Sequence, residues 1–181
     1  MEFESLRQEI ELSAQLLGSL LVEKRRVAAA AESCTGGLLS AAMTSIPGSS
    51  AWFDRGFVTY DVRAKTEMLD VAPELIQREG VVSEAVAKAM ARGAVARSAA
   101  DIAVGITGVA GPGGGTPQTP VGTVAIGWSE RDYDGAVITT ARTILVPGSR
   151  TFVRLVAVRT AIQGMMALLE YEDPALMPCE Y

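Results

Sequence analysis

The chain has 181 residues and contains no histidine. This absence excludes the commonest general base of enzymes, together with Ser-His-Asp and Cys-His catalytic arrangements and most zinc sites. A hydrolytic nucleophile would therefore need activation by another group. The sequence has three lysines. Lys24 sits beside two arginines at the end of an amphipathic run, and Lys88 lies in an alanine-rich segment, so both read as helix-surface residues. Lys65 is the lysine whose surroundings suggest a site.

Other scarcities narrow the class of protein. The two cysteines, Cys34 and Cys179, form neither a disulfide framework nor a set of metal ligands. A net charge of −5 without a lysine-rich tract argues against nucleic-acid binding. No apolar run reaches the length of a membrane span, and the acidic N-terminus does not resemble a signal peptide. We expect a cytoplasmic protein without metal or cofactor.

Hydrophobic patterning predicts one domain over residues 1–181, since 49% of the residues are hydrophobic and no linker interrupts the chain. A period near 3.6 predicts an amphipathic helix over residues 4–23. Further helices are expected at 38–45, after Asp61, at 73–79, at 83–99 and from 149 to about 170, and strands at 27–31, 52–60, 101–107, 121–128 and 136–146. This alternation predicts an α/β fold, a three-layer α/β/α arrangement with a mixed sheet and helices on both faces. The tail from about residue 172 is expected to pack loosely.

Two glycine-containing segments follow predicted strands. Glu32-Ser33-Cys34-Thr35-Gly36-Gly37 precedes a helix, where free backbone amides can hold an anion, although a plain strand-to-helix connection fits equally well. The glycine spacing from Gly105 to Gly111 matches neither a dinucleotide fingerprint nor a phosphate loop of the Walker type. What remains there is a strand end that exposes the Thr107 hydroxyl. The glycine- and proline-rich residues 108–120 are expected to form a mobile loop or lid.

Residues 48–65 combine a serine pair, an aromatic run, Tyr60 and Lys65. Ser49 or Ser50 could act as a nucleophile if burial lowered the pKa of Lys65 to roughly 7–8, so that the neutral amine served as the base. Tyr60 could relay the proton or hold the lysine in place. The competing interpretation is that the aromatic strand belongs simply to the core.

Arg150 is expected in the first turn of the last helix, where a cation opposes the helix macrodipole at a cost of roughly 0.3–1 kcal/mol. An anion bound at that helix end would be attracted by both the arginine and the helix amides. Arg154 lies one turn further along and could take the same part. The alternative is that Arg150 is an ordinary exposed arginine.

Several spaced motifs together resemble a known family. They are Ala31-Glu-Ser-Cys-Thr-Gly-Gly37, Gly48-Ser-Ser-Ala-Trp-Phe53, Gly56-Phe-Val-Thr-Tyr60, Gly108-Val-Ala-Gly-Pro112 and Pro120-Val-Gly-Thr-Val124. The chain resembles the C-terminal domain of the competence/damage-inducible CinA family, the nicotinamide-nucleotide amidases, from about residue 6 to 169. The resemblance is to the stand-alone form, without the additional N-terminal domain that some members carry.

The resemblance implies hydrolysis of nicotinamide mononucleotide to nicotinate mononucleotide and ammonia, without a cofactor, by a homodimer. It implies Ser50 as nucleophile, Lys65 as general base and Tyr60 as a third catalytic residue. Trp52 or Phe57 could hold the cationic pyridinium ring. The residues implied to bind substrate are Thr107, Arg150, Ser33, Thr35, Gly36 and Gly108. The alternative function is a non-catalytic pyridine-nucleotide-binding or regulatory domain.

Overall fold

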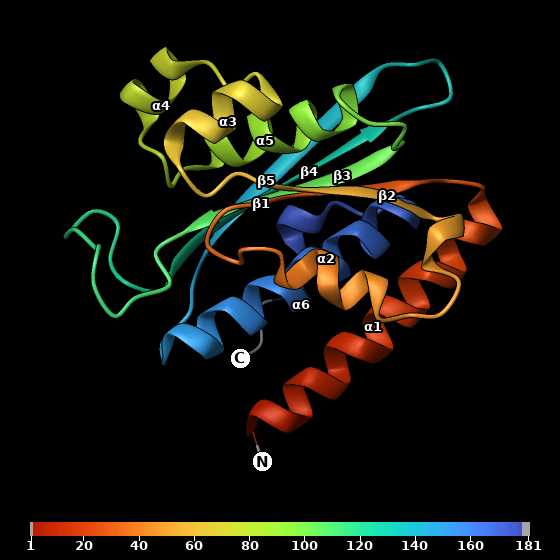
Figure 1. Cartoon of the computed structure of the whole chain (residues 1–181), viewed down its shortest axis with the longest axis horizontal. Helices are drawn as coiled ribbons and strands as arrows, with labels where there is room; N and C mark the ends of the chain where they lie inside the picture. The colour runs from red at the N-terminus through yellow and green to blue at the C-terminus, as the bar shows by residue number, and fades with distance from the viewer. Residues whose placement is uncertain (1, 179–181) are drawn as a thin grey trace.

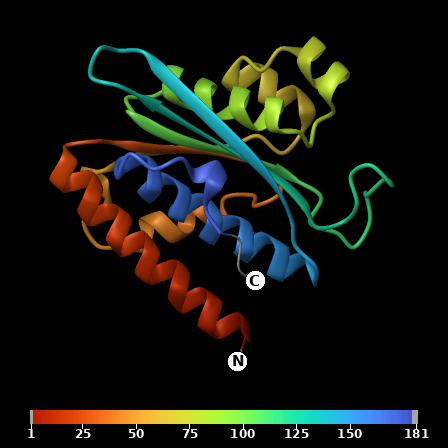
Figure 2. The ribbon, with the colours of Figure 1, turned by 180° about the vertical axis from the view of Figure 1, so that it is seen from behind.

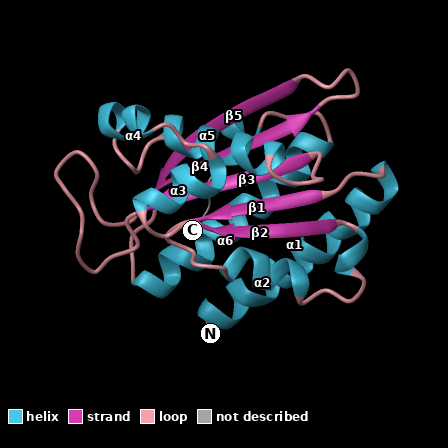
Figure 3. Ribbon diagram, turned by 45° about the horizontal axis from the view of Figure 1, so that its top comes forward, coloured by secondary structure: helices cyan, strands magenta, loops and turns pink. Residues whose placement is uncertain are grey.

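A computed structural model describes residues 2–178 of the chain. Five strands form one sheet in the order β2-β1-β3-β4-β5 (Figure 3). The parallel strands are β1 (Ala28–Glu32), β2 (Phe53–Val58) and β3 (Ile102–Gly108), and the antiparallel strands are β4 (Thr123–Arg131) and β5 (Val137–Leu145). The mixed α/β sheet predicted from the sequence is confirmed.

Helices cover both faces of the sheet, as Figure 1 shows. One face carries α1 (Glu2–Lys24), α2 (Leu38–Thr44) and α6 (Arg150–Leu169), and the other carries α3 (Val62–Leu69), α4 (Pro73–Glu79) and α5 (Glu84–Ala96). Short 3₁₀ turns lie at η1 (Ser49–Ala51) and η2 (Pro174–Leu176). The helices expected after Asp61 and at 83–99 both begin with a side-chain cap. Asp61 accepts from the Arg63 amide at the start of α3, and Ser83 accepts from the Val86 amide at the start of α5.

The strand connections create a switch point beside β1. From β1 the chain passes through α2 to β2 on one side, and from β2 it returns through α3, α4 and α5 to β3 on the other side. The two crossovers therefore lie on opposite faces and diverge at the carboxyl ends of β1 and β2. In open α/β sheets this is where ligands bind.

The aromatic strand β2 carries an irregularity at its start. Ala28 pairs with Phe53 and Ala29 pairs with Arg55, so Asp54 is left as an extra residue. Side chains of this segment do enter the core, since Trp52 and Phe57 are buried.

The helix α6 is long and apolar enough by composition to cross a membrane, but 72% of its apolar window is buried inside the protein. It packs beside α1 across one face of the sheet (Figure 2). Trp128 of β4 donates its indole N–H to the Ala161 carbonyl of α6 at 3.0 Å. The hydrophobicity of α6 is thus that of a core helix.

The tail is held more firmly than the sequence suggested. Pro174 is buried, the Thr140 hydroxyl donates to Asp173 at 3.0 Å, and Arg142 donates to the Met177 carbonyl. These contacts hold residues 173–177 beside β5, while Leu176 stays exposed. Cys179 lies outside the described residues.

Two paired glycines let α5 lie directly on the sheet. Gly105 of β3 is opposite Gly127 of β4. A Cβ atom added to Gly105 would lie 2.4 Å from the Ala87 carbonyl oxygen of α5, and one added to Gly127 would lie 2.6 Å from the Ala87 carbonyl carbon. These distances are too short for any Cβ, so α5 would have to move.

We predict that Gly105→Ala lowers the free energy of unfolding by about 1–3 kcal/mol, the usual cost of overpacking a core. The matched control is Gly113→Ala, because no atom lies within 4 Å of a Cβ added there. Urea unfolding of both variants checks this. Equal stability of the two variants would show that α5 does not depend on the glycine pair.

Candidate active site

The candidate site lies at the switch point, where three parallel strands end together. Ser33 directly follows β1, and its amide donates to the Ile106 carbonyl of β3 at 3.0 Å. Thr59 directly follows β2, and its amide donates to the Glu32 carbonyl of β1 at 2.8 Å. These hydrogen bonds hold the residues after β1 and β2 side by side.

Lys65 reaches this edge from α3 with its side chain fully buried. Its ammonium nitrogen donates to the Ser33 hydroxyl oxygen at 2.9 Å and to the Thr59 carbonyl at 2.6 Å, with a longer contact of 3.5 Å to the Tyr60 carbonyl. All three acceptors are neutral oxygens. The lysine is therefore hydrogen-bonded without a carboxylate among its contacts.

Burial lowers the pKa of Lys65 below its ordinary value of 10.5, because leaving water penalises the charged form. Negative charge on Cys34 and Asp61 acts in the opposite direction. Burial also raises the pKa of the Cys34 thiol to about 11, so at neutral pH the thiol is uncharged and provides none of that support. A protonated thiol is also a poor nucleophile, which leaves Ser33 as the nucleophilic group in contact with the amine.

The buried carboxylate of Glu32 accepts hydrogen bonds from the amides at the start of α2, which the sequence suggested could bind an external anion. It accepts from the amides of Gly37, Leu39 and Ser40 at 2.8–3.0 Å and from the Ser40 hydroxyl at 2.7 Å. The anion at the start of α2 is thus part of the protein, and of the two interpretations this favours a plain strand-to-helix connection.

The turn between β1 and α2 contains other amide donors. Gly36 and Gly37 have φ angles of +57° and +95°, which glycine adopts without strain. The Gly36 amide is used by the Ser33 carbonyl. Within residues 2–178, no backbone carbonyl accepts from the amides of Cys34 or Thr35. These two amides directly follow Ser33.

The structure does not bring Ser50 to Lys65. Ser50 lies in η1 before β2, where the Trp52 carbonyl accepts from the Ala28 amide at the start of β1. Lys65 contacts residues beyond the far end of the same strands. The six-residue β2 spans about 20 Å between them. Within one chain, the expected pairing of Ser50 with Lys65 is therefore wrong, and Ser33 provides the hydroxyl.

Tyr60 presents its backbone to Lys65 and its phenol to the last helix. The hydroxyl accepts from Arg150 at 3.2 Å, and Arg150 also donates to the Gly111 carbonyl at 2.9 Å. A relay of protons through the Tyr60 hydroxyl is not favoured by this geometry. Instead, Arg150 links the Tyr60 phenol to the beginning of the loop 108–120, beside the pair formed by Ser33 and Lys65.

Arg154 ties the loop after β1 to α6. It donates to the Thr35 carbonyl at 2.7 Å, and a Cβ added to Gly36 would lie 3.7 Å from its guanidinium. In the described part of the chain, the Thr35 hydroxyl and the Arg154 Nε are buried without a hydrogen-bond partner. Buried polar atoms ordinarily have partners, so this is a place for a polar ligand group or water. Arg150 and Arg154 both remain candidates for an anion.

Thr107 is already engaged. Its side chain is buried, and its hydroxyl donates to the Val81 carbonyl at 2.8 Å, which ties β3 to the segment before α5. The expectation of an exposed hydroxyl is therefore wrong. Next to it, a Cβ on Gly108 would lie 2.9 Å from the Thr123 carbonyl, so this glycine is explained by close packing.

The aromatic residues expected to hold the pyridinium ring, Trp52 or Phe57, do not line the site. Trp52 and Phe57 are buried in the core, whereas Tyr60 is 61% exposed and its hydroxyl accepts from Arg150. Tyr60 is thus the ring that a ligand at this edge could meet. The sequence carries no local pattern that predicts the proximity of Tyr60 to Arg150.

The family model for the CinA C-terminal domain matches residues 10–169. A CinA-like protein of Chlorobaculum tepidum is 46% identical over 156 residues, covering 86% of this chain but 37% of the relative. The chain spans about a third of the length of several such CinA-like relatives. A nicotinamide-nucleotide amidohydrolase, PncC, of Enterobacter agglomerans is 46% identical over 84% of this chain and 90% of its own length.

Solved structures agree with the family match. The competence/damage inducible protein CihA from Agrobacterium tumefaciens superposes with a TM-score of 0.82 at 42% identity, covering 90% of this chain and 96% of its own. A CinA superfamily protein from Klebsiella pneumoniae gives a TM-score of 0.83 at 33% identity, with 90% and 98% covered. Sequence and fold together show that this chain belongs to the CinA C-terminal domain family.

Proposed function

We propose that the chain hydrolyses the carboxamide of nicotinamide mononucleotide to nicotinate mononucleotide and ammonia, with Ser33 as nucleophile and Lys65 as base. The observation that carries the proposal is the contact of 2.9 Å between the fully buried Lys65 amine and the Ser33 hydroxyl. The substrate is suggested by similarity to the amidohydrolase PncC along most of both chains.

In the first half of the reaction, neutral Lys65 takes the Ser33 proton as the serine oxygen attacks the amide carbon. The carbonyl oxygen becomes an oxyanion, and the amides of Cys34 and Thr35 are the donors available to stabilise it. The tetrahedral intermediate then collapses as the Lys65 ammonium returns a proton to the leaving nitrogen. Ammonia departs and an ester remains on Ser33.

In the second half, Lys65 accepts a proton from water as the water oxygen attacks the ester. The new tetrahedral intermediate expels the serine oxygen, which regains its proton from Lys65. The lysine therefore changes between base and acid in each half, which requires a pKa closer to neutrality than that of an ordinary lysine. A domain that only bound nucleotides would gain nothing from burying this amine against a hydroxyl, which favours the enzyme over the alternative function.

The phosphate and the pyridinium ring of the substrate match the groups around Ser33 and Lys65. Its phosphate fits the N-terminal end of α6, where Arg154 contacts the loop after β1 and Arg150 contacts the loop after β3. Its cationic pyridinium ring fits the exposed face of Tyr60 by a cation–π contact. In this proposal Tyr60 binds substrate and orients Arg150, and Thr35 and Gly36 contribute backbone close to the phosphate.

A cytoplasmic homodimer remains part of the proposal. The helix α1 exposes Leu12 and Leu16, four residues apart, and further along Val22, each more than half exposed. Residues four apart share one helix face, so Leu12 and Leu16 form an apolar pair of the kind that a second copy can cover.

The choice of nucleophile is tested by two serine variants. We predict that Ser33→Ala lowers kcat by about 10³-fold or more, the scale seen when a nucleophile is removed. Ser50→Ala is the matched control and should keep near-normal ammonia release, because Ser50 lies at the opposite end of β2. The reverse result would return the nucleophile to Ser50 and require a second chain to complete the site.

The base is tested by Lys65→Arg, which keeps a cation that cannot be deprotonated in a protein. We predict a loss in kcat of about 10²- to 10⁴-fold. Lys65→Met provides an uncharged second variant, Lys24→Arg and Lys88→Arg serve as controls, and thermal melting verifies folding. In the wild type, kcat should rise with pH through the lowered pKa of Lys65 and level off below pH 10.5, since the neutral amine is the reactive form. A folded Lys65→Arg with normal kcat would exclude Lys65 as the base.

The phosphate position is tested with Arg150→Ala and Arg154→Ala. Phosphate contacts are largely the same in ground and transition states, so we predict a raised KM with little change in kcat. The effect should disappear when nicotinamide riboside, which lacks the phosphate, is the substrate. An equal loss on the riboside would remove the altered arginine from the phosphate site, so the pair of variants also decides between the two.

A further inference from the structure

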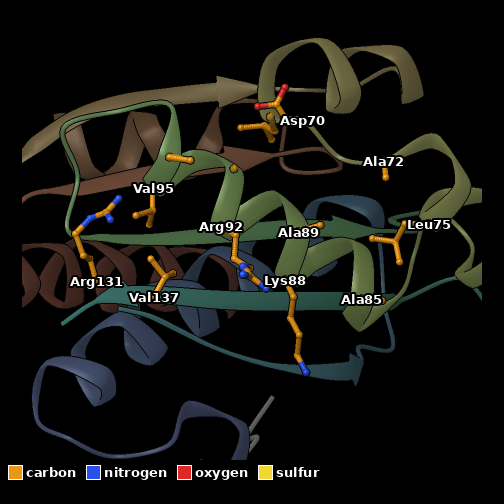
Figure 4. Close-up of a pocket in the computed structure, with 13 residues that line it drawn as sticks. Asp70, Ala72, Leu75, Ala85, Lys88, Ala89, Arg92, Val95, Arg131 and Val137 are labelled. Atoms are coloured by element: carbon orange, nitrogen blue, oxygen red, sulfur yellow. The ribbon is translucent and has the colours of Figure 1, made fainter. Parts of the chain in front are cut away.

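A hollow of about 670 Å³ lies over α5, on the face of the sheet opposite α1 and α6 (Figure 4). Its walls come from α5, from the ends of α3 and β4, from the start of β5 and from residues in and before α4. Neither Ser33 nor Lys65 lines it. The volume falls within the range of about 300–1,000 Å³ that is typical of small-molecule sites. We call it the α5 hollow.

The α5 hollow has an apolar floor. Leu69 at the end of α3, Leu75 of α4, Ala89 of α5 and Val137 of β5 all line it. Leu69 is buried, and the other three are partly buried against the second core cluster. This surface suits an aliphatic or aromatic body.

Three cationic side chains also line the α5 hollow. Lys88 and Arg92 are four residues apart on α5, and in Figure 4 their side chains extend from the helix in the same direction across β5. Arg131 lines the hollow from the end of β4. Throughout residues 2–178, none of these three side chains forms an ion pair or a hydrogen bond.

The acid within the hollow does not balance these charges. Asp70 also lines it, but both its carboxylate oxygens bind the guanidinium of Arg97. Glu84, one helical turn before Lys88, is exposed and forms no ion pair with it in the described chain. Like charges four residues apart on a helix repel each other. An uncompensated cationic rim is therefore maintained on a chain whose net charge is −5.

We propose that the α5 hollow binds a small organic anion, with an apolar body on the floor and a carboxylate, sulfonate or phosphate between Lys88 and Arg92. Such an anion removes the repulsion between the two cations and gains charge-assisted hydrogen bonds from both. The apolar body supplies the burial that a bare inorganic anion lacks. The site is separate from the Ser33–Lys65 pair, so the proposal stands independently of the amidase activity.

The test uses 1-anilinonaphthalene-8-sulfonate, a probe with an aromatic body and one anionic group. Its binding to the full chain is measured by fluorescence titration and located by ¹H–¹⁵N NMR shift changes. We expect saturable binding with shift changes centred on residues 85–96 and on Arg131 and Val137. Lys88→Gln/Arg92→Gln should raise Kd by about tenfold or more, the scale of losing hydrogen bonds to charged groups.

Two controls separate charge from general hydrophobicity. Arg25→Gln/Arg63→Gln removes the same charge from exposed positions outside the hollow and should leave Kd unchanged. The uncharged analogue N-phenyl-1-naphthylamine and inorganic sulfate should each bind more weakly than the probe. The proposal is overturned if the shift changes lie elsewhere, if Lys88→Gln/Arg92→Gln binds the probe as well as the wild type does, or if the uncharged analogue binds equally well.

Discussion

A fully buried primary amine is the constraint on which the site of this protein depends. Lys65 reaches the sheet edge because Asp61 caps α3 immediately after β2, so the helix starts only a few residues from the strand end. The Thr59 carbonyl and the Ser33 hydroxyl then hold the amine between the ends of β1 and β2. Burial without a contacting carboxylate favours the neutral form of the amine, which is the form that can take a proton from serine.

A second buried charge shapes the loop that carries Ser33. Glu32 is the last residue of β1, and its carboxylate satisfies three amides and one hydroxyl at the start of α2. A buried carboxylate is tolerated when its oxygens are hydrogen-bonded in this way. Two adjacent residues at the end of β1 therefore have different roles. Glu32 points toward α2 and binds its first amides, whereas Ser33 points toward α3 and contacts Lys65.

Much of the fold follows from local patterns. The 3.6-residue period predicted α1, and the capping residues Asp61 and Ser83 predicted where α3 and α5 begin. The bounds of α4 agree with the prediction because Pro73 and Gly80 mark both ends. These features depend on neighbours in sequence, where propensity and capping act.

The candidate site depends on contacts between distant segments, and there the sequence interpretation failed in specific ways. Ser50 is nearer than Ser33 to Lys65 in sequence, but a parallel strand carries the chain from one end of the sheet to the other between them. The parallel pairing of β1 and β2 brings the residues directly after both strands together. Thr107 has a partner in Val81, and Thr140 and Arg142 bind the tail, through contacts that no local pattern encodes.

The most direct test of the central claim is the pKa of Lys65 itself. The chain has only three lysines, so labelling with [ε-¹³C]lysine gives three methylene signals, and the Lys65 signal is identified by its loss in Lys65→Arg. We predict that this signal titrates well below 10.5, whereas titration at or above that value would contradict a neutral lysine base.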